Sequence, residues 1–132
     1  RALGFVDFPL YATHPRIGYL YQADQRGAFL NENDWAINDL AMPVAREWDP
    51  TAAPNLLVIG NSIVAGGNPY ADAEKVGSLL SRKLGSRFAV WPVAVGGWST
   101  VNSVAYLESR PQVLAANSLF VWVHVGGGLQ ST

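Results

Sequence analysis

The segment Leu56–Gly67 reads LLVIGNSIVAGG, and it decides the fold. Its first four residues are apolar without alternation, which is the pattern of a strand buried on both faces of a parallel sheet. Gly60 ends this apolar run, and Ser62 follows it in the next turn. Glycine in such a turn permits close approach of the backbone. We therefore predict a buried strand that presents the Ser62 hydroxyl at the edge of a sheet.

Strand and helix patterns alternate along the rest of the chain. Apolar runs predict strands at Phe88–Val95 and Leu119–Val125, and helical spacing or capping signals predict helices at Ala71–Leu84, Val101–Glu108 and Pro111–Ala116. Strands separated by helices imply right-handed crossovers and a parallel sheet with helices on its faces. We predict an α/β fold, a three-layer α/β/α (flavodoxin-like) parallel sheet that is incomplete in this chain. Its glycine-bearing strand ends share the edge where such folds bind ligands.

The N-terminal part of the chain, residues 1–54, has no sustained periodicity. Turn signals occur at Asn31–Asp34 and Trp48–Pro50, between many aromatic residues. Aromatic side chains bury large areas, so we interpret them as anchors rather than as a ligand stack. The predicted organisation is a loop-rich extension over residues 1–54 that packs on a domain formed by residues 55–132.

Composition limits the classes of function. The 132 residues suit one domain, 49% of them are hydrophobic, and the net charge is -1 without a run of Lys or Arg. These values argue against nucleic acid and anionic membranes as partners. Because there is no cysteine, disulfides and thiolate chemistry are excluded.

Membrane and targeting signals are not evident in this sequence. The longest apolar stretch, Ser118–Gly128, is far below the roughly 20 residues of a membrane span. The sequence begins with Arg1 rather than methionine, so we expect a processed or trimmed product. The compartment is left open, with an extracytoplasmic bacterial location as the first choice.

Each predicted strand ends in a glycine-containing turn, which we call a glycine corner. Two of these glycine corners resemble the motifs of a known family. The segment Ile59–Val64, followed by Gly66 and Gly67, resembles the first block of the SGNH (GDSL-like) hydrolases, although asparagine stands at Asn61 where the family usually has aspartate. The segment Val93–Thr100 is similar to the family's second block. The resemblance covers about residues 55–129.

The resemblance implies a serine esterase or O-acyltransferase that acts on an ester-linked acyl group, with acetyl on a carbohydrate as our preferred substrate. Ser62 would be the nucleophile, and the N–H groups of Ser62 and Gly97 would hold the oxyanion. Asn61, Trp98 and Gly128 would lie on the substrate side, with Trp98 exposed. Neither a cofactor nor a metal is implied.

The third glycine corner departs from the family pattern. The family usually has Gly-x-Asn-Asp there, whereas this chain reads His124-Val125 followed by Gly126–Leu129. Gly128 or Val125 takes the place of the asparagine, and neither offers a side-chain donor. Losing one oxyanion donor costs about 2.7 to 4 kcal/mol, or roughly 100- to 1000-fold in rate.

A general base is also missing from the sequence pattern. The family's Asp-x-x-His block has no match before Thr132, and we assign neither histidine to that role. We expect His14 to be an exposed loop residue, and His124 to point inward and bond a backbone carbonyl. Since a sheet ending at its third strand would leave an apolar edge unpaired, we hypothesise that the rest of the domain lies on a second polypeptide or was lost.

Two other functions stay open on the sequence alone. One is a catalytically impaired carbohydrate-binding or scaffold domain that retains the SGNH fold. The other, ranked last, is a nucleotide-binding doubly wound domain, because both G-x-G-x-x-G and G-x-x-x-x-G-K-[ST] are missing from the chain.

Overall fold

The computed structural model describes residues 11–29, 33–52, 54–67, 69–116 and 118–124. Its strands are β1 (Tyr11–His14), β2 (Gly18–Tyr21), β3 (Gln25–Phe29), β4 (Asn33–Ile37), β5 (Asn55–Gly60), β6 (Ala89–Ala94) and β7 (Ser118–Trp122). Its helices are α1 (Ser62–Ala65), α2 (Val76–Leu84), α3 (Thr100–Glu108) and α4 (Pro111–Ala115), with 3-10 turns η1 (Asp72–Glu74) and η2 (Gly85–Arg87).

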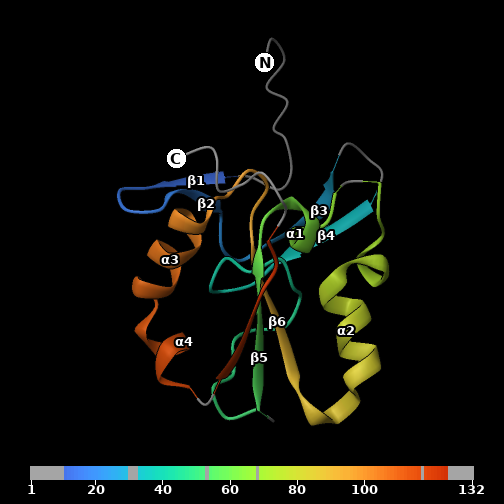
Figure 1. Ribbon diagram of the computed structural model, residues 1–132. Coiled ribbons are helices and arrows are strands. Elements are labelled where there is room, and N and C mark those ends of the chain that lie inside the picture. Colours follow the sequence, from blue (N-terminus) through green and yellow to red (C-terminus); the bar gives the residue numbers. More distant parts are fainter. Residues whose placement is uncertain (1–10, 30–32, 53, 68, 117, 125–132) are drawn as a thin grey trace.

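A three-stranded parallel sheet forms the centre of the molecule (Figure 1). Its strand order is β6-β5-β7, and both pairs with β5 are parallel. The predicted α/β alternation is therefore confirmed for these elements, and helices flank the sheet. The central strand β5 is buried along its whole length, as its continuous apolar run predicts.

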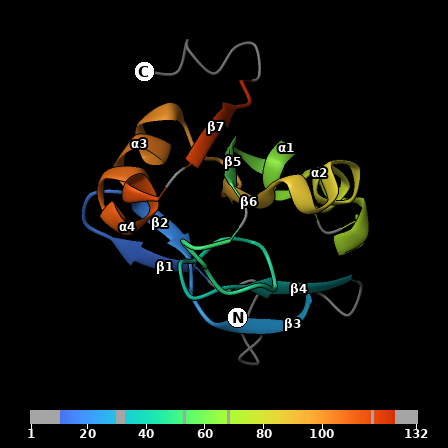
Figure 2. The ribbon, with the colours of Figure 1, turned by 90° about the horizontal axis from the view of Figure 1, so that it is seen from below.

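The two faces of β5 pack against different partners because successive side chains of a strand point to opposite faces. Leu57 and Ile59 join the larger core cluster, which includes residues of β6, α3, α4 and the N-terminal hairpins. Leu56 and Val58 join a second cluster with residues of α1 and α2. Figure 2 shows α2 on one side of the sheet and α3 and α4 on the other.

The described N-terminal residues are more regular than we predicted. Instead of a loop-rich extension, β1 pairs with β2 and β3 pairs with β4 in two antiparallel hairpins. Buried side chains of these hairpins, among them Tyr21 and Trp35, belong to the larger core cluster together with residues of the sheet. Short strands with mixed burial leave only weak periodicity in the sequence, which is why the hairpins were missed.

The helix predicted at Ala71–Leu84 begins later than expected. Residues before it form η1, and Lys75 has an extended backbone (φ -74°, ψ 153°), so α2 starts at Val76. Leu79, which we assigned to the apolar face, is 46% exposed, whereas Val76 and Leu80 pack on the core. The helix ends at Gly85 as predicted.

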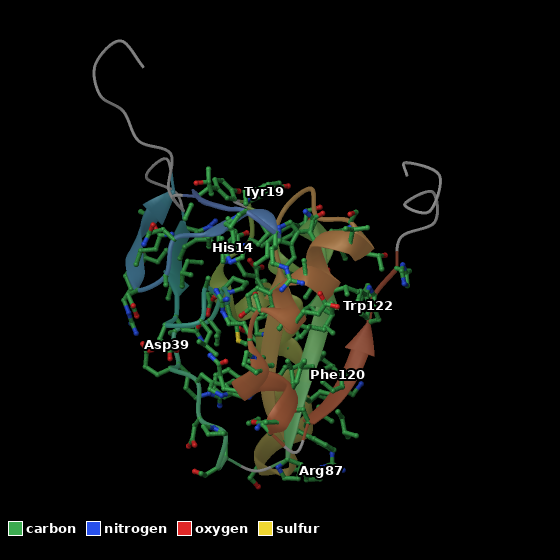
Figure 3. The ribbon with its side chains drawn as sticks, turned by 90° about the vertical axis from the view of Figure 1, so that its left-hand side faces the viewer. His14, Tyr19, Asp39, Arg87, Phe120 and Trp122 are labelled. Carbon is green, nitrogen blue, oxygen red and sulfur yellow. The ribbon has the colours of Figure 1, made fainter. Side chains whose placement is uncertain are left out.

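Strand β7 lies at one edge of the sheet and exposes apolar side chains. Leu119, Phe120 and Val121, which belong to the apolar run that predicts this strand, are between 45% and 54% exposed. Figure 3 shows Phe120 and Trp122 along this strand. Within the described residues, β7 pairs only with β5. The strand ends at Trp122, before the predicted end, since Val123 and His124 do not belong to it; Val125 lies outside the described residues.

Candidate active site

The turn that carries the candidate nucleophile Ser62, residues 60–63, connects β5 to α1 and is called the nucleophile turn below. Asn61 is the N-cap of α1, and its side-chain oxygen accepts a hydrogen bond from the Ile63 N–H at 3.1 Å. Asparagine and aspartate cap helices about equally well, so the departure from the family pattern at Asn61 preserves the turn. Ser62 is the first residue of α1, and it is exposed. The predicted strand-to-turn geometry is therefore present.

Gly60 is required by the close return of α1 onto the end of β5. A Cβ atom at Gly60 would lie 2.5 Å from Val64 Cγ2 and 3.2 Å from Val64 Cβ. Val64 is buried and, being β-branched, has little freedom to rotate away. A larger residue at Gly60 would therefore displace α1 and with it Ser62.

Two backbone donors lie at the neighbouring loops. A Cβ atom added to Gly96 would lie 3.9 Å from Ser62 Cβ, which places the β6–α3 loop beside the nucleophile turn. Gly97 follows with φ +81°, a conformation that favours glycine. Within the described part of the chain, neither the Ser62 N–H nor the Gly97 N–H forms a hydrogen bond. Because α1 is only one turn long, it adds no long helix dipole to these two N–H groups.

Tyr19 of strand β2 fixes the second glycine corner, residues 96–97, through hydrogen bonds. The Tyr19 hydroxyl donates a hydrogen bond to the Gly96 carbonyl at 2.7 Å, and the Trp98 indole N–H donates to the Tyr19 carbonyl at 2.8 Å. A Cβ atom at Gly97 would lie 2.6 Å from the Tyr19 hydroxyl. Sequence reasoning missed Tyr19 as a site residue, because no local pattern links residues so far apart in the chain.

Trp98 does not form the exposed platform that we predicted. The residue is 5% exposed, and its ring packs against Tyr106 with centroids 5.7 Å apart. Burial also raises the pKa of the Tyr106 hydroxyl well above its usual range. Trp98 is thus an anchor that fixes the loop after Gly97, because its indole N–H and its ring are both used internally.

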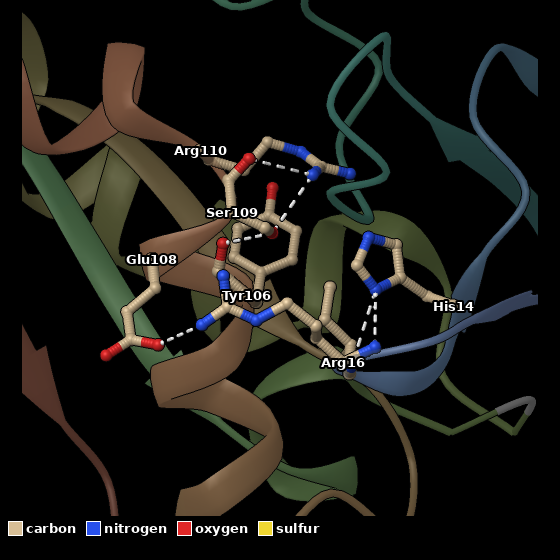
Figure 4. A network of polar contacts seen from close by, with 7 residues as sticks. His14, Arg16, Tyr106, Glu108, Ser109 and Arg110 are labelled. Atoms are coloured by element: carbon tan, nitrogen blue, oxygen red, sulfur yellow. Dashed lines mark hydrogen bonds and ion pairs between the residues drawn. The ribbon is translucent and has the colours of Figure 1, made fainter.

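His14 closes the β1–β2 turn. Its Nδ1 accepts hydrogen bonds from the backbone N–H groups of Arg16 (3.3 Å) and Ile17 (3.2 Å), so it is not the exposed loop residue that we expected. Beside it, Arg16 forms an ion pair of 2.9 Å with Glu108 of α3, as Figure 4 shows. Figure 3 places His14 well apart from Trp122 at the end of β7. His14 therefore has a structural role.

His124 is exposed and lies near the nucleophile turn. Its ring stacks on Trp122 with centroids 6.0 Å apart and an interplanar angle of 10°, so the inward orientation that we predicted is wrong. Together with Gly60 and Asn61 it lines a cavity of about 40 Å³. Such a volume holds a water molecule or a group of similar size. No pattern in the sequence links His124 with this turn.

Ser62 lines a larger cavity, of about 410 Å³, on the opposite side of the turn toward α2. Gly128 lies outside the described residues, so the structure does not place it. In the described residues, no group of three or more His, Cys, Asp or Glu side chains could hold a metal ion. None of the described helices combines the length and apolar character needed to cross a bilayer.

Comparison with known proteins adds no relative. No protein-family model matches this sequence, and no curated protein gives a significant match. The site that can be argued from geometry therefore consists of Ser62 on its capped turn and the two backbone donors, with Gly97 held by Tyr19.

Proposed function

We propose that this chain is the nucleophile-bearing part of an SGNH-type serine esterase or O-acyltransferase with a three-layer, flavodoxin-like sheet. The observation that carries the proposal is the exposed Ser62 at the end of the central strand, with unengaged N–H groups at Ser62 and Gly97 on adjacent loops. In the reaction Ser62 Oγ attacks the ester carbonyl, the alcohol leaves, and water or a second alcohol then takes the acyl group.

The two N–H groups supply the electrostatic part of catalysis. The carbonyl oxygen becomes negatively charged in the tetrahedral intermediate, and each well-placed donor is worth about 2.7–4 kcal/mol there. The Gly96–Gly97 segment is held by Tyr19 through the Gly96 carbonyl, so its N–H direction is set before substrate binds. Such preorganisation is what makes a donor effective.

A serine hydroxyl needs a base within hydrogen-bond reach, and the described residues place none on Ser62 Oγ. We propose that the base comes with a further polypeptide segment that pairs with the edge of β7 that no described strand covers. The exposed apolar residues Leu119, Phe120 and Val121 support this, because soluble proteins cover such edges. Intact-mass and light-scattering measurements on purified protein test it: a 132-residue monomer without a companion polypeptide would contradict the pairing.

Labelling of Ser62 tests the proposed chemistry. We expect a fluorophosphonate probe to label the protein and p-nitrophenyl acetate to be turned over slowly, and both signals to disappear in Ser62→Ala. Ser86→Ala is the matched control, because Ser86 is exposed in η2 at the other end of the sheet. Equal signals from the wild type and Ser62→Ala would refute the proposal.

The second candidate function is a non-catalytic carbohydrate-binding domain on the same fold. It is favoured by the lack of a base on Ser62 within the described residues and by the sizeable cavity beside that residue. Glycan binding that survives Ser62→Ala, without any esterase signal in either protein, would select this candidate.

A further inference from the structure

The cavity of about 410 Å³ beside Ser62 has the size of a small-molecule site. Its walls come from α1, from the segment that leads to η1, and from the start of α2. Pockets for small ligands usually measure about 300–1,000 Å³. The other cavity at the nucleophile turn measures about 40 Å³, so it cannot take the larger part of an ester. Ser62 lines only the larger of these two cavities, so we assign the larger part of its substrate to that cavity.

Two exposed apolar side chains form part of this cavity. Tyr70 is 56% exposed and Ile63 is 53% exposed, and both line it together with Ser62. The face of an aromatic ring carries negative charge and attracts C–H groups that point at it. Tyr70 thus offers a platform for a ring that has an apolar C–H face, beside an aliphatic contact at Ile63.

The polar groups of the cavity suit hydroxyls rather than anions. One carboxylate oxygen of Glu74 accepts the Ala71 N–H at 2.8 Å, and an ionised carboxylate keeps further acceptor capacity for hydroxyl donors. The Lys75 ammonium is already engaged, since it lies 3.5 Å from the centroid of the Trp35 ring and 3.8 Å from Asp72 Oδ1. Among the described residues that line it, the cavity therefore presents an acceptor and no free cation, which disfavours carboxylate and phosphate ligands.

Lys75 contributes its aliphatic stem as the floor of the cavity. The side chain is 5% exposed, and a Cβ atom on Gly66 would lie 2.7 Å from Lys75 Cγ. The stem is thereby packed under the glycine that follows α1. The Lys75 stem packs against Gly66 and its ammonium contacts Trp35 and Asp72. The floor of the cavity is therefore in place before a ligand binds.

We infer that this cavity binds the sugar ring of an acylated carbohydrate. The pyranose stacks on Tyr70, and one of its hydroxyl groups donates a hydrogen bond to the Glu74 carboxylate. The inference rests on the proposed function, because it places the acyl ester at Ser62. It assigns Tyr70 and Glu74 as specificity-determining residues, which no motif in the sequence indicates.

The test compares two acetyl esters that differ only in the alcohol. Ethyl acetate has no sugar ring to stack on Tyr70, whereas methyl 6-O-acetyl-α-D-glucopyranoside carries one. We expect Tyr70→Ala to lower the ratio of kcat/KM for the sugar ester to that for ethyl acetate about tenfold, the change that 1.4 kcal/mol produces. Tyr70→Phe keeps the ring and should retain the wild-type ratio. Phe120→Ala is the control for loss of an exposed aromatic ring outside the cavity.

A binding measurement separates this inference from the proposed function. Saturation-transfer NMR with methyl 6-O-acetyl-α-D-glucopyranoside is performed on Ser62→Ala, which cannot turn the ester over. Transfer to the sugar ring protons that is lost in Ser62→Ala/Tyr70→Ala supports the site even if no esterase activity exists. Conversely, Ser62-dependent turnover of ethyl acetate with no Tyr70-dependent sugar binding would overturn the inference and leave the esterase proposal standing. Binding of an aryl ester but not of the sugar ester would also overturn it.

Discussion

Replacing Gly60 with alanine should strain the nucleophile turn in a way that a second substitution relieves. The added Cβ atom would lie 2.5 Å from Val64 Cγ2, far inside contact distance. Overpacking of this kind costs about 1–3 kcal/mol. Alanine also restricts the unfolded chain, which offsets about 0.4–1 kcal/mol of that cost. We expect Gly60→Ala to lower the free energy of unfolding by up to about 2.6 kcal/mol.

Val64→Ala removes the methyl groups that the new Cβ atom would meet. On its own it should destabilise the protein by about 1.5–2.5 kcal/mol, since each buried methylene contributes about 0.8 kcal/mol and a cavity is left. In the double variant the 2.5 Å clash with Cγ2 is gone and only the 3.2 Å approach to the Cβ atom of residue 64 remains, so we expect its destabilisation to be about 1–3 kcal/mol less than the sum of the single ones. Labelling of Ser62 should fall in Gly60→Ala and recover in the double variant.

Urea denaturation followed by far-UV circular dichroism measures these free energies. Gly77→Ala is the control, because its Cβ atom would lie 3.4 Å from Pro92 Cγ and alanine favours the helix. It should be neutral or stabilising. Additive effects of Gly60→Ala and Val64→Ala, to within about 0.5 kcal/mol, would refute the proposed contact between the turn and α1.

Three further predictions concern the supports of the site. Gly66→Ala should destabilise more than Gly85→Ala by about 1–3 kcal/mol in urea denaturation, because both glycines have positive φ but only Gly66 meets a side chain, that of Lys75; equal losses would contradict this. Trp98→Phe should lower the free energy of unfolding by about 1–3 kcal/mol, because the Tyr19 carbonyl loses its indole donor. A loss no larger than that caused by a substitution on the surface would argue against this role. Burial lowers the pKa of Lys75 below its ordinary 10.5, so the unfolded state binds more protons between the two pKa values and stability gains with rising pH there. The unfolding free energy of the wild type minus that of Lys75→Met should accordingly rise from about pH 8 to pH 10. A difference that does not change with pH would contradict this prediction.

Local patterns were enough to predict the elements that carry the candidate nucleophile. The continuous apolar run before Gly60 identified the central strand, and apolar runs and glycine stops located β6, α2 and α3 to within a few residues. These signals are local because burial on one or both faces imposes a period on neighbouring residues. Ser62 was singled out because it follows the central strand in a turn, whereas Gly97 was proposed from the resemblance of its segment to the second block of the SGNH family.

The surroundings of the site depended on tertiary contacts. Trp98 is buried because Tyr19, from a hairpin far away in the sequence, accepts its indole N–H and covers the Gly96 carbonyl. The partners of His14 and His124, by contrast, are near in sequence: they are the N–H groups of Arg16 and Ile17 and the ring of Trp122. The N-terminal hairpins were missed because their strands are short and half-buried, so their periodicity is weak.

The sequence by itself determined the alternation of strand and helix, the glycine corners and the serine that follows the first of them. Only the tertiary structure decided which side chains line the cavities at that turn, namely Tyr70 and Glu74 together with Ser62 in the larger one and His124 together with Gly60 and Asn61 in the smaller one. The physical reason is that periodicity and turn chemistry are properties of a few adjacent residues, whereas a cavity is shaped by how whole elements pack.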